Sequence, residues 1–162
     1  MDSTNANSEM KQFVTFRLEN EKYGVDILKV QEINNLKEFT KVPHAPDYVE
    51  GAINLRGKVI PVLNLRKRFG LGLKPLDETT KIVIMNVRGI VTGILVDSVS
   101  EVLRIPQNII VPPPPTSASI AAQFIVGIAR LEQELIILLD IDKLLGSEEY
   151  AAVFGSLNEM SG

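Results

Sequence analysis

Short runs of alternating apolar and polar residues divide most of the chain. Gln12 to Leu18 (QFVTFRL) alternates with a period of two and ends at a polar turn, which predicts a strand. Tyr23 to Val25 is expected to begin a second strand. The next segment, Asp26 to Glu32, fits either a short helical turn or a bent strand, and its pattern does not decide between them. Lys37 to Val42 predicts a further strand, closed by prolines.

Three pairs of segments predict β-hairpins, each closed by two turn residues. The pairs are Ala52–Leu55 with Lys58–Leu65, Lys81–Val87 with Ile90–Val96, and Gly127–Leu131 with Leu135–Ile141. Glycine supplies the turn at Arg56-Gly57 and Arg88-Gly89, whereas Glu132-Gln133 forms the third turn. Ser100 to Ile105 extends the sheet. Pro61 interrupts its strand and predicts an edge strand or a bulge, since proline cannot donate a ladder hydrogen bond.

Helical structure is expected to be short. Pro46 to Gly51 predicts a single helical turn that glycine ends, and Arg66 to Gly70 predicts a short helix of the same kind. Residues 147–162 predict a C-terminal helix and tail, because their apolar side chains recur at helical spacing. Residues 1–11 are expected to be a disordered tail, and the prolines at 112–115 a stiff loop.

Two stretches of the chain are near-copies of each other. Tyr48–Gly70 (YVEGAINLRGKVIPVLNLRKRFG) aligns without a gap on Phe124–Gly146 (FIVGIARLEQELIILLDIDKLLG). A weaker match precedes each copy, in which Val30, Glu32 and Ile33 correspond to the segment from Val99 to Val102. A unit repeated only twice indicates two similar half-domains that pack together.

The pattern therefore predicts an all-β protein built as two small barrels. The first barrel is expected at about residues 12–73 and the second at about 80–146, with strand exchange between them left open. Each half is marginal on surface-to-volume grounds, so the halves should share an interface and unfold together.

Composition excludes several classes of function. The 162 residues carry a net charge of −3, which argues against nonspecific binding to nucleic acid. The chain has no cysteine, so disulfides, thiol catalysis and Cys-ligated zinc are excluded. Its polar N-terminus lacks an apolar signal region, and no apolar run approaches the roughly 18 residues of a membrane span, so a cytoplasmic protein without membrane insertion is expected.

Candidate reactive residues are few. His44 is the only histidine and lies between prolines, which does not favour a catalytic triad. Asp140 and Asp142 are spaced like cation ligands, but other oxygen donors are missing nearby, so a helix N-cap role is preferred. The run Arg66-Lys67-Arg68 is interpreted as a solvated face. Gly70-Leu71-Gly72 follows a short helix instead of a strand and lacks the third glycine of a nucleotide loop. We therefore expect no enzyme activity, cofactor or metal site.

The segments YGVDILKVQEI, VEGAINLRGKVIPVLNLRKRF and GILVDSVSEVL together resemble the CheW family of chemotaxis coupling proteins, in the family order and over about residues 12–149. The resemblance implies two SH3-like five-stranded barrels and a non-enzymatic adaptor. Its implied partners are the regulatory domain of the chemotaxis histidine kinase CheA and the cytoplasmic tip of methyl-accepting chemoreceptors. It also implies a monomer when free, recruited through its partners to membrane-associated receptor arrays. The alternative from another class is a small β-barrel that binds RNA or another polyanion, which predicts aromatic residues on a basic face.

The resemblance also implies where the partners bind. The receptor-binding groove would comprise Val30, Ile33, Arg56, Val99 and Val102. The kinase-binding and turn positions would be Glu32, Gly51, Gly57, Val59 and Pro61. From the residues alone, the four apolar groove positions fit a buried core equally well, since β-branched residues in strands are commonly buried. An Arg56–Glu32 pair would fix the turn and orient the partner.

Overall fold

The computed structural model describes residues 9–113 and 123–144, and strands predominate among them, so the all-β class is confirmed. The strands are β1 (Met10–Leu18), β2 (Glu21–Asp26), β3 (Val30–Asn35), β4 (Val49–Leu55), β5 (Lys58–Asn64), β6 (Lys81–Val87), β7 (Ile90–Val96), β8 (Ser98–Pro106), β9 (Ile110–Val111), β10 (Ile125–Leu131) and β11 (Glu134–Leu139). The helical segments are η1 (Ile27–Lys29), α2 (Leu65–Arg68), η2 (Gln107–Ile109) and η4 (Ile141–Leu144).

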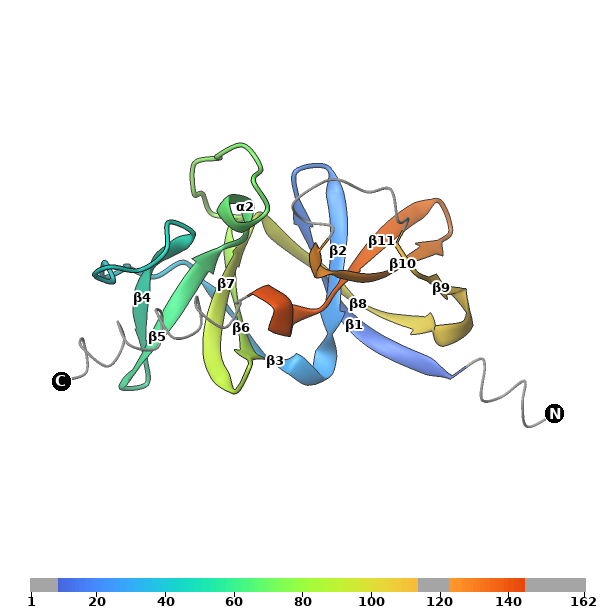
Figure 1. The fold of residues 1–162 in the computed structure, drawn as a ribbon, viewed down its shortest axis with the longest axis horizontal. Helices are drawn as coiled ribbons and strands as arrows, with labels where there is room; N and C mark the ends of the chain where they lie inside the picture. The colour runs from blue at the N-terminus through green and yellow to red at the C-terminus, as the bar shows by residue number, and fades with distance from the viewer. Residues whose placement is uncertain (1–8, 114–122, 145–162) are drawn as a thin grey trace.

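The strands form two curled sheets that lie side by side (Figure 1). Sheet A is six-stranded in the order β8-β1-β2-β11-β10-β9, and sheet B is five-stranded in the order β3-β6-β7-β5-β4. Sheet A thus combines the hairpin β1–β2 from the first copy with β8, β10 and β11 from the second. Sheet B combines β6–β7 from the second copy with β3, β4 and β5 from the first. The strand exchange that the sequence analysis left open is therefore present, and each sheet takes strands from both of the ranges 12–73 and 80–146.

The duplication is visible in the structure in detail. The hairpin β4–β5 followed by α2 corresponds to β10–β11 followed by η4, and both hairpins carry a bulge at their repeated glycine, Gly51 or Gly127. The Asn64 amide donates to the Tyr48 carbonyl at 2.7 Å, and the equivalent Asp140 amide donates to the Phe124 carbonyl at 2.8 Å. The two copies therefore share backbone geometry as well as sequence.

The apolar core falls into three clusters because both faces of the central strands are buried. On β6, Ile82 and Ile84 point into the core of sheet B, whereas Val83 and Met85 point into a larger cluster. Phe13 on β1 joins the core of sheet A, and its neighbour Val14 joins the larger cluster. The larger cluster draws on strands of both sheets, so it lies between them and provides the interface expected from the small size of each half.

Several predicted elements need correction. The strand expected at Lys37–Val42 is reduced to one bridge between Thr40 and Ala52, because Phe39 turns inward to pack on the core of sheet B. The helical turn expected at Pro46–Gly51 is a β-turn in which the Val49 amide donates to the Pro46 carbonyl at 3.0 Å, and Gly51 lies within β4. The undecided segment Asp26–Glu32 forms η1 and then enters β3.

Pro61 is also placed differently from the prediction. It lies on β5, which has β4 and β7 as neighbours and is not an edge strand. The bulge is on β4, at Val49 to Gly51, and β7 pairs with β5 only from Val62 onward. Pro61 therefore lies before the pairing of β5 with β7 begins, where its missing N–H is not needed as a donor to β7. Met10 and Lys11, which were expected in the disordered tail, belong to β1. Residues 1–8 of that tail, the prolines at 114–115 and the helix at residues 147–162 lie outside the described residues.

Candidate partner-binding site

The four apolar positions assigned to a receptor groove lie on equivalent strands at the edges of the two sheets. Val30 and Ile33 are on β3, which ends sheet B, and Val99 and Val102 are on β8, which ends sheet A. Their pairings match: Val30 lies opposite Met85 on β6, and Val99 lies opposite Phe16 on β1. The two halves therefore present the same apolar spacing on the two edge strands.

Burial separates the four positions into two kinds. Val30 and Val99 are half-buried and pack against the cluster between the sheets. Ile33 is 43% exposed and Val102 is 49% exposed. The interpretation that all four side chains belong to the core is therefore partly correct for Val30 and Val99. It is wrong for Ile33 and Val102. Large exposed apolar side chains at equivalent places indicate a surface for a partner.

The expected Arg56–Glu32 pair is present beside this strip. Arg56 lies in the β4–β5 turn with a φ of 53°, and its guanidinium donates to both oxygens of Glu32 on β3, one bond measuring 3.3 Å. The hydrogen bond from Arg56 lowers the pKa of the Glu32 carboxyl. Since β3 and β4 are the two ends of sheet B, the pair lies between those ends at the surface.

The positions assigned to kinase docking or to the turn differ in exposure. Val59 is exposed, whereas Pro61 is buried against Ala52, which corrects its expected place on an open edge. A Cβ on Gly51 would lie 2.8 Å from the Thr40 carbonyl oxygen, so this glycine permits a close backbone approach. Gly57 has a φ of +85° and open space around it, so its role is the turn itself.

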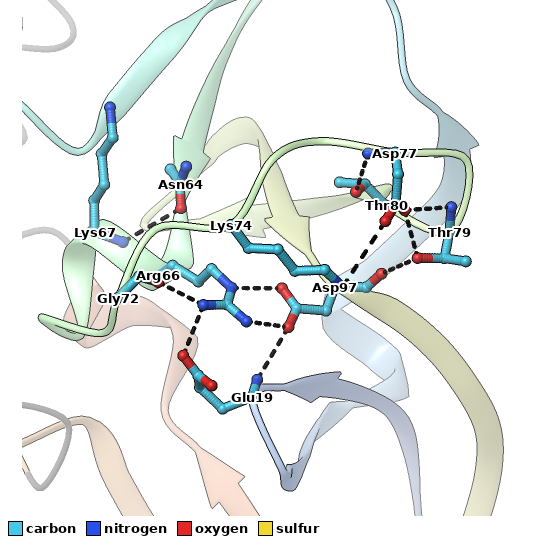
Figure 2. Close-up of polar contacts among 10 residues, drawn as sticks. All are labelled: Glu19, Asn64, Arg66, Lys67, Gly72, Lys74, Asp77, Thr79, Thr80 and Asp97. Atoms are coloured by element: carbon cyan, nitrogen blue, oxygen red, sulfur yellow. Dashed lines mark hydrogen bonds and ion pairs between the residues drawn. The ribbon is translucent and has the colours of Figure 1, made fainter.

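A buried polar network that the sequence analysis missed joins α2 to the β1–β2 turn and to the link between β7 and β8 (Figure 2). Arg66 on α2 donates from Nε to Asp97 Oδ1 at 2.8 Å and from Nη2 to Asp97 Oδ2 at 2.7 Å. It also donates to Glu19 Oε1 at 2.7 Å and to the Gly72 carbonyl. The Arg66 side chain is 10% exposed and that of Asp97 is 13% exposed. Burial opposes ionisation of Asp97, but hydrogen bonds from Arg66 and from the Glu19 amide hold its pKa below the ordinary value.

The solvated face predicted for Arg66-Lys67-Arg68 is therefore wrong. Arg68 lies over the rings of Tyr48 and Phe124, 4.6 and 4.8 Å from their centroids, and donates from Nε to the Leu144 carbonyl at 2.7 Å. The run of three basic residues suggested an exposed surface. The only sequence signal for a specific contact at position 66 was that the second copy has an aspartate, Asp142, in the equivalent place.

The two aspartates of the second copy have separate roles. Asp140 Oδ1 accepts from the Asp142 amide at 3.1 Å at the start of η4, which confirms the N-cap interpretation for Asp140. Asp142 instead accepts from the Arg88 amide at 2.9 Å and from Lys29 Nζ at 3.3 Å. The hydrogen bond from the Arg88 amide is the main cause that lowers the pKa of Asp142. No three potential metal-ligating side chains cluster within residues 9–113 and 123–144.

Two further surface features are a cleft on sheet A and the exposed His44. An apolar cleft of about 450 Å³ opens on sheet A, with Phe13, Ile110 and Leu138 among its lining residues. His44 is exposed in its turn, with a φ of 59°. Within the described part of the chain, no helix has the length and apolar character needed to cross a membrane.

The fold defines a β protein of two lobes with equivalent edge strands. Residues 12–149 match the CheW-like domain, and the chain belongs to this family of chemotaxis adaptor proteins. It is 41% identical over 143 residues to the chemotaxis protein CheW of Klebsiella aerogenes, covering 88% of this chain and 86% of that protein. It is 40% identical over 147 residues to the CheW of Treponema pallidum, with the same coverages.

A solved structure agrees with these sequence relatives. The crystal structure of the scaffolding protein TtCheW from Thermoanaerobacter tengcongensis superimposes with a TM-score of 0.80 at 40% identity, over 87% of this chain and 96% of that one. The family resemblance and the fold class predicted from the sequence are therefore confirmed.

Proposed function

We propose that this chain is a non-enzymatic cytoplasmic adaptor that couples the cytoplasmic tips of chemoreceptors to the histidine kinase CheA. The observation that carries the proposal is the pair of equivalent edge strands, β3 and β8, each with one exposed large apolar side chain, Ile33 or Val102. Membership of the CheW-like family supports the same assignment.

A receptor tip built from helices suits such a strip. An amphipathic helix presents apolar residues at i, i+3 and i+4, and it binds by laying that face against an apolar surface. Val30 and Ile33 supply that surface on β3, and the Arg56–Glu32 pair beside them supplies oriented charges. The exposed Val59, on the strand that follows Arg56, supports the β4–β5 end as the kinase-docking surface.

The adaptor transmits signal by geometry. It holds receptor and kinase at a fixed separation, and a receptor shift changes which arrangement of the kinase is favoured. This works only if the adaptor contacts two states differently, because equal contact with both would shift nothing. Its recruitment to membrane-associated arrays then depends on its partners.

The test is a reconstituted assay with a receptor cytoplasmic fragment, the kinase and ATP. Ile33→Glu and Val102→Glu each place a charge in the apolar strip and should weaken receptor binding by roughly tenfold or more. The matched control is Leu73→Glu in the loop between α2 and β6, where the original side chain is 74% exposed. Equal receptor binding by all three variants would refute the proposed site.

Arg56→Glu tests the charged part of the surface. It sets a like charge beside Glu32 and should weaken assembly with receptor and kinase, while the thermal midpoint stays nearly unchanged, because the pair is exposed. A large fall in the midpoint would mark Arg56 as a structural residue instead.

The RNA-binding alternative is not favoured. It needs exposed aromatic rings on which bases stack. Phe16, Tyr23, Phe69 and Phe124 instead form one buried series of ring contacts, with centroid distances of 5.4 to 5.9 Å.

A further inference from the structure

Strand β8 carries a β-bulge between the two valines of the proposed partner-binding strip. Val99 and Val102 are separated on β8 by two residues, Ser100 and Glu101. The residues opposite the two valines lie on β1 at positions 16 and 14, and only Thr15 lies between them. Over this stretch β8 therefore contains one residue more than β1, which defines a bulge on β8.

This bulge places the two valines on the same face of sheet A. In a regular strand, side chains three positions apart point to opposite faces. Phe16 and Val14 are two positions apart on β1 and share a face, and a residue directly opposite in an antiparallel pair lies on that face too. Val99 and Val102 thus share a face because of the extra residue. Without it, Val102 would turn to the other face and leave the strip.

Buried polar side chains of sheet A hold the bulge of β8. The Thr15 hydroxyl is fully buried, donates to the Glu101 carbonyl at 2.6 Å and accepts from the Glu101 amide at 3.1 Å. The Glu101 carboxylate accepts from Nζ of Lys22 at 3.1 Å, and Lys22 is itself buried. A bulge disrupts the local backbone ladder, so the Thr15 hydroxyl supplies a partner for both backbone groups of the bulged residue.

The equivalent bulge on β3 has no such hydroxyl opposite it. Val30 and Ile33 lie opposite Met85 and Val83 on β6, with Ile84 between these two. Ile84 occupies the place of the threonine, and its side chain cannot form a hydrogen bond. The first copy therefore shows that an apolar residue at this place permits the bulge, and the hydroxyl on β1 has a role beyond forming it.

We propose that Thr15 is a positioning residue for partner binding, which fixes the bulge of β8 and so holds Val102 at the surface in the orientation that the partner contacts. Lys22 supports it by holding the side chain of the same bulged residue, Glu101. A group that is fixed before binding loses less conformational freedom when the partner arrives, which increases affinity. This inference rests on the proposed function, because the partner concerned is the chemoreceptor tip.

The experiment is a double-mutant cycle in the full-length chain, with binding of the receptor cytoplasmic fragment as the readout. Thr15→Val keeps the shape of threonine and removes the hydroxyl, and Val102→Ala removes the contact that the hydroxyl positions. We expect Thr15→Val to weaken binding by roughly three- to tenfold, since two hydrogen bonds to the bulge are lost. The double variant should bind no more weakly than Val102→Ala alone, because Thr15 acts through Val102.

Two further variants separate positioning from general stability. Thr15→Ser keeps the hydroxyl and should bind the fragment like the original chain. Ile84→Val removes one buried methylene at the equivalent place of β6, and it should leave binding unchanged although it costs stability. Equal weakening by Ile84→Val and Thr15→Val, or additive losses in the cycle, would show that Thr15 acts on stability alone and would overturn the proposal.

Hydrogen exchange of the Glu101 amide distinguishes the ways in which the proposal can fail. Thr15→Val should speed this exchange by roughly tenfold or more, and Thr15→Ser should not. Faster exchange with unchanged binding would overturn the positioning role and leave the proposed function standing. Unchanged exchange would overturn the role of the hydroxyl in fixing the bulge. Unchanged binding by Val102→Ala would show that the proposed site is wrong, and the positioning role would fall with it.

Lys22→Met is the substitute if Thr15→Val does not fold. Methionine fills the buried space of the lysine stem, and Glu101 and Glu134 are about half exposed, so both carboxylates regain water. Lys22→Met should also weaken binding of the fragment and should be non-additive with Val102→Ala. Unchanged binding, or an additive loss, would overturn the proposal in this cycle as well.

Discussion

A single substitution in the buried Arg66–Asp97 pair should lower the stability of the fold. Arg66→Ala removes two hydrogen bonds to Asp97 and one to Glu19, and it leaves the Asp97 carboxylate almost enclosed. An ionised group left unpaired in such a site loses water without gaining a partner.

The magnitude follows from burial. Both side chains of the pair are close to one tenth exposed, so the pair belongs with buried ion pairs, for which loss of one partner costs about 3–5 kcal/mol. The total stability of a domain is only about 5–15 kcal/mol. For a chain of this size, about 2–4 °C is lost per kcal/mol, so the thermal midpoint should fall by roughly 6–20 °C.

Thermal and urea unfolding followed by circular dichroism measure the effect, with Asp97→Ala and the double variant completing a cycle. The double variant should be less destabilised than the sum of the two singles, since it leaves no unpaired charge. The pKa of Asp97 is lowered in the folded state, so its stabilising effect is present at neutral pH and is lost on acidification. The gap between Arg66→Ala and the original chain should therefore narrow below about pH 4. A loss of less than about 1 kcal/mol at neutral pH, or an additive cycle, would refute the reasoning.

Two further predictions concern acid stability and the glycines. Asp97 and Asp142 both have lowered pKa values in the folded state, so on acidification the unfolded chain takes up protons before the folded chain does. The free energy of unfolding should therefore be constant above about pH 5 and fall below about pH 4. Urea titrations at each pH measure it. A flat profile down to pH 3 would contradict this. Gly57→Asn should be nearly neutral, because asparagine tolerates a positive φ and the site is open, whereas Gly51→Asn should cost about 1–3 kcal/mol, because its Cβ would meet the Thr40 carbonyl. Equal thermal midpoints for the two variants would show that the close approach at Gly51 is not limiting.

Alternation and repeat spacing were enough to predict the hairpins but not their partners. The hairpins at Ala52–Leu65 and Lys81–Val96 are local, so turn residues and a period of two specify them. The sequence left open which hairpin joins which sheet, because the matching residues are mostly apolar or glycine, and apolar side chains at the same spacing fit either sheet. The exchange depends on pairings between residues far apart in the sequence, such as β2 with β11 and β5 with β7, which periodicity cannot connect.

For the surface residues, too, the sequence predicted some features and not others. The family resemblance supplied Arg56 and Glu32, and the contact between them is present. Periodicity could not separate the half-buried Val30 from the exposed Ile33, because the difference comes from the packing of Val30 against the cluster between the sheets.

The exchanged hairpins have a practical consequence for the loop between α2 and β6. Residues 73–79 of this loop are exposed. A protease cut there yields two fragments, and each fragment supplies strands to both sheets. The fragments are therefore interlocked by backbone pairing and buried side chains, so the nicked molecule holds together without a covalent link. Neither lobe can be isolated by cutting the chain between its two repeats, and fragments made separately should complement each other when mixed.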